Sequence, residues 1–314
     1  MSMPETMQLR IVIGIPTFRR PDLLRILLDS LLPEIQGRDV YVVVADNDCG
    51  TEAQAVVAEF TQHWPVAECI PVRERGVAQV RNALVRRAAE VCPEWDWLLM
   101  LDDDGRVTPG WLDQVLQTGQ RFDAHLVGGP VDGLLPDSAS IFARNSIFAS
   151  RKRWPTGLVS TLNTTQNLAV ARKTVDLIGI PLFRNEYGAS GGEDYDLFRR
   201  VARAKGRIAW CDEALVIEPA PSDRLTFISL LRRYATTGAY MVRIDRFYDG
   251  LPSTSWNACK GLAVSLLRTV AAAVLMRRDT CARSILVTAH YCGRIAGLAG
   301  ARTARYVSSE GKNS

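Results

Sequence analysis

The segment Trp97-Leu98-Leu99-Met100-Leu101-Asp102-Asp103-Asp104-Gly105 decides the fold class of this chain. Five consecutive apolar residues are typical of a strand buried on both faces of a parallel sheet, and three carboxylates follow it directly. A second apolar run, residues 11–15, ends at Pro16 in a similar way. Ligands of open α/β sheets bind beyond the carboxyl ends of the strands, so we expect the functional site where these strands end.

Strand and helix patterns alternate on both sides of this segment. The predicted strands of the first half are 11–15, 40–45, 67–70 and 97–101, and the helices between them are 21–32, 52–62 and 76–90. Single helices between strands indicate right-handed β-α-β crossovers. The pattern is looser after Gly110, with strands expected at 125–131, 167–170 and 208–216 and a helix at about 194–205. The sequence therefore predicts a doubly wound α/β sheet with helices on both faces.

Charge divides the chain near Pro221. The whole chain of 314 residues carries a formal net charge of +4, but residues 221–314 contain 14 Lys and Arg against 5 Asp and Glu. These basic residues lie among aliphatic runs at 261–276 and 284–300, which favours an anionic phospholipid surface over nucleic acid as partner. Arg268 and Arg294 interrupt the two runs. Since a membrane span requires about 20 apolar residues, we expect interfacial helices.

Several classes of protein are excluded. The seven cysteines are scattered without metal-ligand spacing, which argues against a zinc site and a disulfide scaffold. No Walker A motif, no G-x-G-x-x-G after a strand and no G-x-S-x-G is present. The first ten residues, MSMPETMQLR, show no signal-peptide pattern, so the body of the protein is expected in the cytoplasm.

The three adjacent aspartates predict a cation site. Alternate residues of an extended strand share a face, so Asp102 and Asp104 are expected to act together. Carboxylate oxygens suit Mg²⁺ or Mn²⁺, with a polyphosphate completing the coordination. An acidic helix start or a solvated turn is the simpler alternative. An aspartyl-nucleophile phosphatase is disfavoured by Arg106 at the fifth position, and an EF-hand by the contiguous acids and the missing bidentate Glu.

Two further groups of charged residues are candidates. Gly191-Gly192-Glu193-Asp194 places carboxylates at a predicted helix start, where an acid can act as a general base or simply cap the helix. Arg73, Arg75 and Arg81, with Asn82, surround the start of the 76–90 helix. These arginines are placed to neutralise a diphosphate or to form a solvated helix face.

The order of these motifs resembles that of family 2 glycosyltransferases. The resemblance covers about residues 9–240 and rests on the following segments: Ile15-Pro16-Thr17-Phe18-Arg19-Arg20, Val43-Val44-Ala45-Asp46-Asn47-Asp48, Gly76 with Arg81-Asn82-Ala83, Leu101-Asp102-Asp103-Asp104 and Gly192-Glu193-Asp194. It implies an inverting enzyme of the GT-A fold that uses a nucleotide sugar. The sequence is most similar to bacterial exopolysaccharide enzymes of the succinoglycan type, which transfer glucose from UDP-glucose to a lipid-linked oligosaccharide.

The resemblance implies a role for each matching residue. Pro16, Thr17 and Arg19 would line the nucleobase pocket, with Asp46 on uracil, Asp103 near the ribose, Arg75 and Arg81 at the diphosphate, Asp104 with Asp102 at the metal, and Asp194, next to Glu193, as the catalytic base. Close relatives carry an acid where this chain has Gly105, which puts a fourth carboxylate ligand in doubt. Leu231-Arg232-Arg233-Tyr234 replaces the acceptor motif of processive synthases, which favours transfer of a single sugar.

The resemblance also implies an organisation of the chain. A catalytic domain would span residues 1–220, with a nucleotide-binding half at about 9–104 and an acceptor half at 105–220, and a basic helical region at 221–314 would associate with the membrane. The expected protein is peripheral, on the cytoplasmic face of the bacterial inner membrane. The alternatives are a nucleotidyltransferase, although the 16–20 segment lacks the glycine-rich loop typical of that class, and a membrane-surface nucleotide-sugar-binding protein without catalysis.

Overall fold

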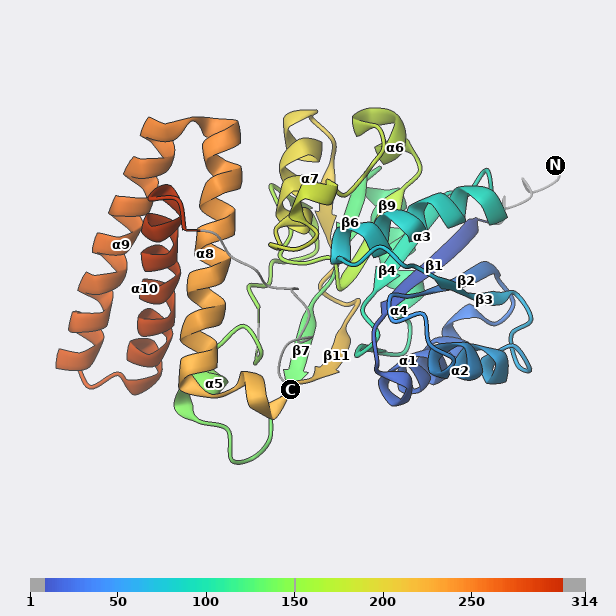
Figure 1. The fold of residues 1–314 in the computed structure, drawn as a ribbon, viewed down its shortest axis with the longest axis horizontal. Coiled ribbons are helices and arrows are strands. Elements are labelled where there is room, and N and C mark those ends of the chain that lie inside the picture. The colour runs from blue at the N-terminus through green and yellow to red at the C-terminus, as the bar shows by residue number, and fades with distance from the viewer. Residues whose placement is uncertain (1–8, 150, 302–314) are drawn as a thin grey trace, which may run out of the picture. The chain divides into compact units, whose positions relative to one another are not determined.

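The computed structural model describes residues 9–149 and 151–301. Its main sheet has eight strands in the order β3-β2-β1-β4-β9-β6-β10-β8 (Figure 1). These strands are β1 Arg10–Thr17, β2 Asp39–Asp46, β3 Ala67–Pro71, β4 Trp97–Leu101, β6 Leu126–Gly128, β8 Gly157–Val159, β9 Asn167–Ala171 and β10 Ile208–Trp210. Strands β1 to β4 are parallel, whereas β9 runs antiparallel to both β4 and β6, so the sheet is mixed.

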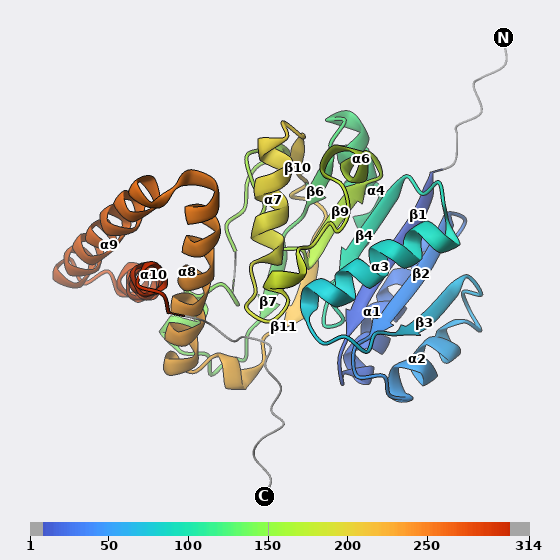
Figure 2. The same ribbon diagram turned by 45° about the horizontal axis from the view of Figure 1, so that its top comes forward.

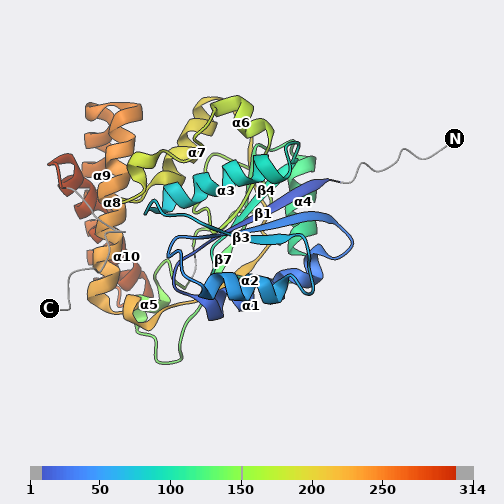
Figure 3. The same ribbon diagram turned by 45° about the vertical axis from the view of Figure 1, so that its right-hand side comes forward.

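Helices cover both faces of this sheet (Figure 3). In β1 and β4 the alternation of side chains separates two cores, with Ile13 and Leu99 on one face and Val12 and Leu98 on the other. The first core packs against α1 Pro21–Ile35, α2 Glu52–Phe60 and α4 Trp111–Arg121, and the second against α3 Val77–Val91 and part of α7 Glu193–Arg203. The predicted helical cover of both faces is confirmed.

Two predicted strands are each divided in the structure. The 125–131 segment becomes β6 and β7 Val131–Leu134, because Gly129-Pro130 interrupts the ladder and proline has no N–H to donate. The 208–216 segment becomes β10 and β11 Val216–Pro219, separated by a turn. The short strands β7 and β11 form a second sheet of order β5-β11-β7 with β5 Arg106–Val107.

The chain forms two compact units. One unit contains residues 1–131, 153–185 and 197–217, and the other contains residues 132–152, 186–196 and 218–314. The first holds the main sheet with α6 Lys173–Ile178. The boundaries expected at residues 104 and 220 stay predictions. The N-terminal segment in which we expect no signal peptide lies mostly outside the described residues, and residues 302–314 of the basic region do so entirely.

The second unit is mostly helical (Figure 2). Its helices are α5 Ile141–Arg144, α8 Phe227–Asp249, α9 Leu251–Val274 and α10 Arg278–Leu298, and a small core of Ala143, Phe148, Leu230 and Leu286 joins α5 to α8 and α10. Helices α8 and α10 approach closely, because a Cβ at Gly238 would overlap the His290 carbonyl and a Cβ at Gly293 would overlap that of Ala235. These two glycines therefore allow the backbones of α8 and α10 to pack closely.

Helix α9 differs from the expectation for the basic region. From the sequence, the uninterrupted apolar stretches of this region are too short to span a membrane. Helix α9 has 24 residues, and by length and composition alone it is apolar enough to cross one. Only 17% of its most apolar window is buried inside the structure. The C-terminal helices are thus compatible with membrane association.

Candidate functional site

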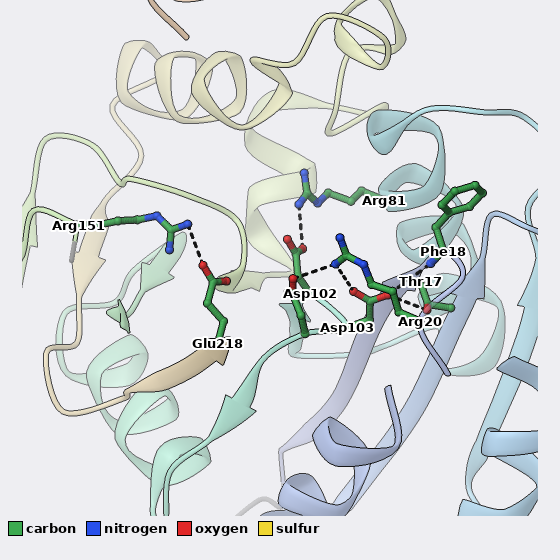
Figure 4. A network of polar contacts seen from close by, with 9 residues as sticks. Thr17, Phe18, Arg20, Arg81, Asp102, Asp103, Arg151 and Glu218 are labelled. Atoms are coloured by element: carbon green, nitrogen blue, oxygen red, sulfur yellow. Dashed lines mark hydrogen bonds and ion pairs between the residues drawn. The ribbon is translucent and has the colours of Figure 1, made fainter. Parts of the chain in front are cut away.

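The carboxyl end of β1 meets the aspartates that follow β4 (Figure 4). The Thr17 hydroxyl donates a hydrogen bond to Asp103 Oδ2 at 2.8 Å, and the Phe18 backbone N–H lies 3.4 Å from the same oxygen. Arg20, which precedes α1, places one guanidinium nitrogen 3.2 Å from Asp103 Oδ1 and 2.8 Å from Asp104 Oδ2. The site predicted at the ends of these strands therefore has a defined polar network.

The three aspartates do not continue the strand. β4 ends at Leu101, and the Gly105 N–H donates to the Asp102 carbonyl at 3.1 Å, which closes a turn. Asp102 then pairs with Arg81 of α3 at 3.1 Å, whereas Asp103 and Asp104 share Arg20. The extended backbone expected to put Asp102 and Asp104 on one face is thus replaced by a turn that directs them to different arginines.

Asp103 has an unusual electrostatic environment. Burial raises the pKa of its carboxyl to about 6, and the neighbouring charges of Asp104 and Asp102 add to the effect. The Arg20 guanidinium and the Thr17 hydroxyl oppose this change, because both favour the ionised carboxylate. Three adjacent acids at a buried strand end therefore need positive charge, and a bound cation would add to what the arginines supply.

The end of β2 orders the neighbouring loops. Asp46 is only 3% exposed, and its carboxylate accepts hydrogen bonds from the N–H groups of Asp48 at 2.8 Å and Gly50 at 3.0 Å. The Asn47 side chain donates to the carbonyls of Val72 at 2.7 Å and Glu74 at 2.9 Å. Asp46 and Asn47 therefore hold the loops that follow β2 and β3.

An exposed aromatic ring contacts two cations at this edge. Phe18 is 44% exposed, and the guanidinium groups of Arg19 and Arg75 lie 5.0 and 4.9 Å from its ring centroid. Arg19 also donates to Asp48 Oδ1 at 2.8 Å, while Arg75 donates to the Asn47 carbonyl. Side chains from three separate strand ends thus form one surface, next to the half-buried Pro16 of β1.

Phe18, Arg20 and Asp48 were absent from the predicted site residues. Arg20 could have been identified from the sequence. Three adjacent carboxylates require compensating cations, and Arg20 follows a strand that ends at the same edge of the sheet. The Phe18 arrangement had no local signal, since it depends on loops that are distant in sequence. Asn82, noted beside the arginines, is buried and bonds to both backbone groups of Phe183, so it fixes the loop before residue 185.

The second predicted carboxylate pair begins α7. Gly191 and Gly192 have φ values of +80° and +103°, which confirms the glycine turn. A Cβ at Gly192 would lie 2.8 Å from the Ile244 side chain, so that position also requires glycine for space. Glu193 is 4% exposed, and Asp194 is half-buried with its Oδ1 accepting from the N–H of Tyr195 at 2.7 Å. Both acids are therefore held in the first turn of α7.

A hydrogen-bond network fixes the first turn of α7 within its unit. The Tyr195 hydroxyl donates to Asp245 Oδ1 at 2.6 Å, and Arg294 lies 2.6 Å from the other oxygen of the same carboxylate. The Tyr248 hydroxyl donates to Asp196 at 2.7 Å. Helices α8 and α10 therefore position the turn that carries Glu193 and Asp194.

The aspartates after β4 are suited to a divalent cation that is coordinated by carboxylates and a phosphate together. Throughout residues 9–149 and 151–301, no group of three or more His, Cys, Asp or Glu side chains is arranged to hold a metal ion. Mg²⁺, however, is usually bound by one or two carboxylates together with substrate phosphates and water. The oxygen-only set of Asp102 and Asp104 matches that preference.

A mixed sheet of this order, with carboxylates beyond its central strand, is the GT-A fold of nucleotide-sugar-dependent glycosyltransferases. Residues 9–237 match the family described as Glycosyltransferase like family 2, and the chain belongs to that family. It is 33% identical over 235 residues to the succinoglycan biosynthesis protein ExoM of Rhizobium meliloti (strain 1021), a match that covers 73% of each chain. The predicted family is confirmed, and so is the similarity to a succinoglycan biosynthesis protein.

Solved structures support the fold. The mannosyltransferase PcManGT from Pyrobaculum calidifontis, in complex with GDP-Man and Mn²⁺, has a TM-score of 0.59 at 14% identity, with 92% of this chain and 88% of that chain covered. Residues 1–349 of TarS from S. aureus, in complex with UDP-GlcNAc, have a TM-score of 0.53 at 15% identity, with 92% and 91% covered. At these identities the likeness concerns the fold alone.

Proposed function

We propose that this glycosyltransferase moves a single hexose, glucose by its resemblance, from a UDP-sugar to a lipid-linked saccharide during exopolysaccharide synthesis. The observation that carries the proposal is the cluster of Thr17, Arg20, Asp103 and Asp104 at the carboxyl edge of the sheet. This is the place where open α/β sheets bind ligands. The similarity to a succinoglycan biosynthesis protein supports the choice of pathway.

The nucleoside would bind at the ends of β1 and β2. Phe18 offers an exposed ring for stacking on a base, beside Pro16, Thr17 and Arg19. Asp46 would contact uracil, and Asp103 would lie near the ribose. Because the Asp46 carboxylate already accepts two backbone N–H groups, we assign it the additional role of ordering the loop at the base.

The diphosphate would bind next to the aspartates. Asp104 with Asp102 would hold Mg²⁺ or Mn²⁺, which stabilises negative charge on the departing UDP. Arg75 and Arg81 would supply further positive charge, since guanidinium groups form paired hydrogen bonds with phosphate oxygens. Arg81 is buried and fixed by Asp102, whereas Arg75 is exposed enough to reorient.

The acceptor hydroxyl would lose its proton to Asp194, assisted by Glu193. The glycosyl–phosphate bond breaks as the acceptor oxygen attacks the anomeric carbon from the opposite face, which inverts that carbon. Asp194 lies in the first turn of α7, and a carboxylate is a suitable acceptor for this proton. The turn at Gly191 and Gly192 sets the position of this acid through its positive φ angles.

Donor and metal dependence are tested with the purified full chain. The chain is incubated with radiolabelled UDP-glucose, UDP-galactose, UDP-GlcNAc or GDP-mannose and a bacterial lipid extract, with Mn²⁺ or with a chelator. We expect label from UDP-glucose to enter the lipid phase only when the metal is present. Transfer from GDP-mannose alone, or transfer unaffected by the chelator, would contradict the proposal.

Two aspartate variants separate donor binding from chemistry. Asp104→Asn should abolish metal-dependent UDP binding, whereas Asp194→Asn should leave UDP binding intact and lower turnover by about 10²–10⁴-fold, as expected for a lost general base. Asp113→Asn and Asp223→Asn remove exposed carboxylates elsewhere in the chain and serve as matched controls. A normal rate for Asp194→Asn would exclude this residue as the base.

The proposed location is the cytoplasmic face of the bacterial inner membrane, with peripheral attachment through the C-terminal helices. The apolar α9 and the basic residues of the region support an anionic membrane surface as partner. A lipid-linked acceptor would then lie at the same surface as the enzyme.

A further inference from the structure

The helical unit contains a cavity that the proposed sugar transfer does not use. Its volume is about 520 Å³, and it lies between α9 and α10 beside Asn145 at the end of α5. This volume falls within the roughly 300–1,000 Å³ of typical small-molecule sites. Its walls carry polar side chains, including Ser265 of α9 and Ser284 of α10, both of which are buried. The cavity is therefore suited to a polar ligand.

The lining of this cavity is positively charged. Arg268 of α9 and Arg283 of α10 both line it, and neither has an ion-pair partner in the part of the chain that the structure describes. The one lining carboxylate, Asp279, already accepts a hydrogen bond from the Asn145 amide at 2.7 Å. Two guanidinium groups that stay charged at every physiological pH are thus available to an anion.

The start of α10 adds to the positive potential. This helix of 21 residues begins at Arg278, and no side chain caps its N-terminus. Its first-turn residues Asp279 and Thr280 line the cavity, so the positive end of the helix dipole lies beside the two arginines. A helix N-terminus beside two arginines is suited to an anion such as a phosphate group.

An apolar surface adjoins the cavity. Val264 lines the cavity and is 38% exposed, and the following turns of α9 expose Leu267 at 69%, Val270 at 61% and Val274 at 75%. Helices α9 and α10 lie side by side (Figure 2), and the exposed apolar residues continue along α9 from Val264. A molecule with a phosphate group and a long hydrocarbon chain would match both features, whereas a free phosphate would match only the cavity.

We propose that the cavity between α9 and α10 binds the phosphate group of an anionic lipid, with the lipid chain lying along the exposed apolar side of α9. Arg268 and Arg283 bind the phosphate, and the Ser265 and Ser284 hydroxyls lie within the same cavity. A membrane phospholipid and a polyprenyl phosphate share this chemistry. The proposal does not depend on sugar transfer, since it concerns binding alone.

The test measures flotation of the full chain with vesicles and no sugar donor. Vesicles of phosphatidylcholine alone are compared with vesicles that also contain phosphatidylglycerol or a polyprenyl phosphate. Arg268→Gln/Arg283→Gln should weaken binding to the anionic vesicles by about 25-fold, at about fivefold per arginine near a membrane surface. Arg243→Gln/Arg246→Gln removes the same charge from exposed positions of α8 and should change binding by less than about twofold. Arg268→Lys/Arg283→Lys keeps the charge and should retain most of the affinity.

Each outcome decides the proposal. Preference for phosphatidylglycerol or for polyprenyl phosphate identifies the lipid, and either preference supports the site. Equal losses in the two glutamine pairs would overturn it, because binding would then follow net charge rather than the cavity. Equal binding to neutral and anionic vesicles would also overturn it, because the cavity would then show no preference for a lipid with a charged phosphate group. Unchanged helix content by circular dichroism shows that the variants fold.

Discussion

Asp103 shows how burial and charge compete at one residue. Burial of its side chain raises the pKa to about 6, while Arg20 and the Thr17 hydroxyl favour the ionised form. With this pKa the carboxyl is mostly ionised at neutral pH and takes up a proton at about pH 6. Its hydrogen bond with Thr17 joins the ends of β1 and β4, so the same contact affects stability and the geometry of the site.

Thr17→Val should destabilise the protein and weaken donor binding. The substitution removes a buried hydrogen bond to a carboxylate, which contributes about 1.5–3 kcal/mol. Urea unfolding measures the stability, and titration with UDP measures the binding. Thr61→Val is the matched control, because the Thr61 hydroxyl bonds only to the Ala58 carbonyl at a helix end. Equal effects of the two substitutions would show that the Thr17–Asp103 bond has no special role.

Individual elements were predictable where local pattern and packing agree. The run of apolar residues at 97–101 and the glycine turn at 191–192 appear as predicted, since each depends on neighbouring residues. The division of the 125–131 strand follows from Pro130, because the apolar pattern of this segment continues through the proline although the strand ladder does not. The Phe18 surface was not predictable, because it forms only when three loops meet.

The packing of α10 on α8 places a buried ion pair between them. Arg294 and Asp245 are each 8% exposed, and their side chains approach to 2.6 Å. Arg294→Met should lower the free energy of unfolding by about 3–5 kcal/mol, since it leaves Asp245 buried without a counter-charge. Thermal unfolding followed by helix ellipticity measures the loss. Arg294→Met/Asp245→Asn should recover part of it, and a double variant as unstable as the sum of the single variants would contradict the pairing.

The same helix carries a pH-dependent group. Burial lowers the pKa of His290 to about 4, and the Arg294 charge adds to this, while the ordinary value is 6.5. An unfolded chain therefore binds the proton more readily than the folded one, so stability is complete above pH 6.5 and falls as the pH decreases towards 4. With about 1.4 kcal/mol per pKa unit, the loss is about 3 kcal/mol. His290→Gln should reduce this acid destabilisation in urea unfolding at pH 7, 6 and 5. An unchanged slope would exclude His290 as its source.

At the scale of the whole molecule, the charge pattern of the sequence identified the basic region, but it did not indicate that this region packs with segments from the middle of the chain. Residues 218–314 share a unit with residues 132–152 and 186–196. Ala143 and Phe148 of the middle segment pack against Leu230 and Leu286 of the C-terminal region. Truncation near residue 217 would expose this core and leave the Glu193–Asp194 turn without its supporting helices. Membrane attachment is therefore better tested by surface substitutions in the full chain.

Leu267→Glu/Val270→Glu should detach the protein from vesicles. Both side chains are more than 60% exposed on α9, so the substitutions cost little folding energy. Burial of a large aliphatic side chain contributes about 1.5–3 kcal/mol, so loss of two such groups should lower the vesicle partition coefficient at least about tenfold. Gln54→Glu/Gln62→Glu adds the same charge at exposed positions of the unit that holds the main sheet and controls for simple repulsion. If both pairs lowered the partition coefficient equally, α9 would not be the membrane-contacting helix. The two α9 positions differ from the arginines of the adjoining cavity, so a variant that loses chain contact yet keeps headgroup selectivity would separate the two contributions to binding.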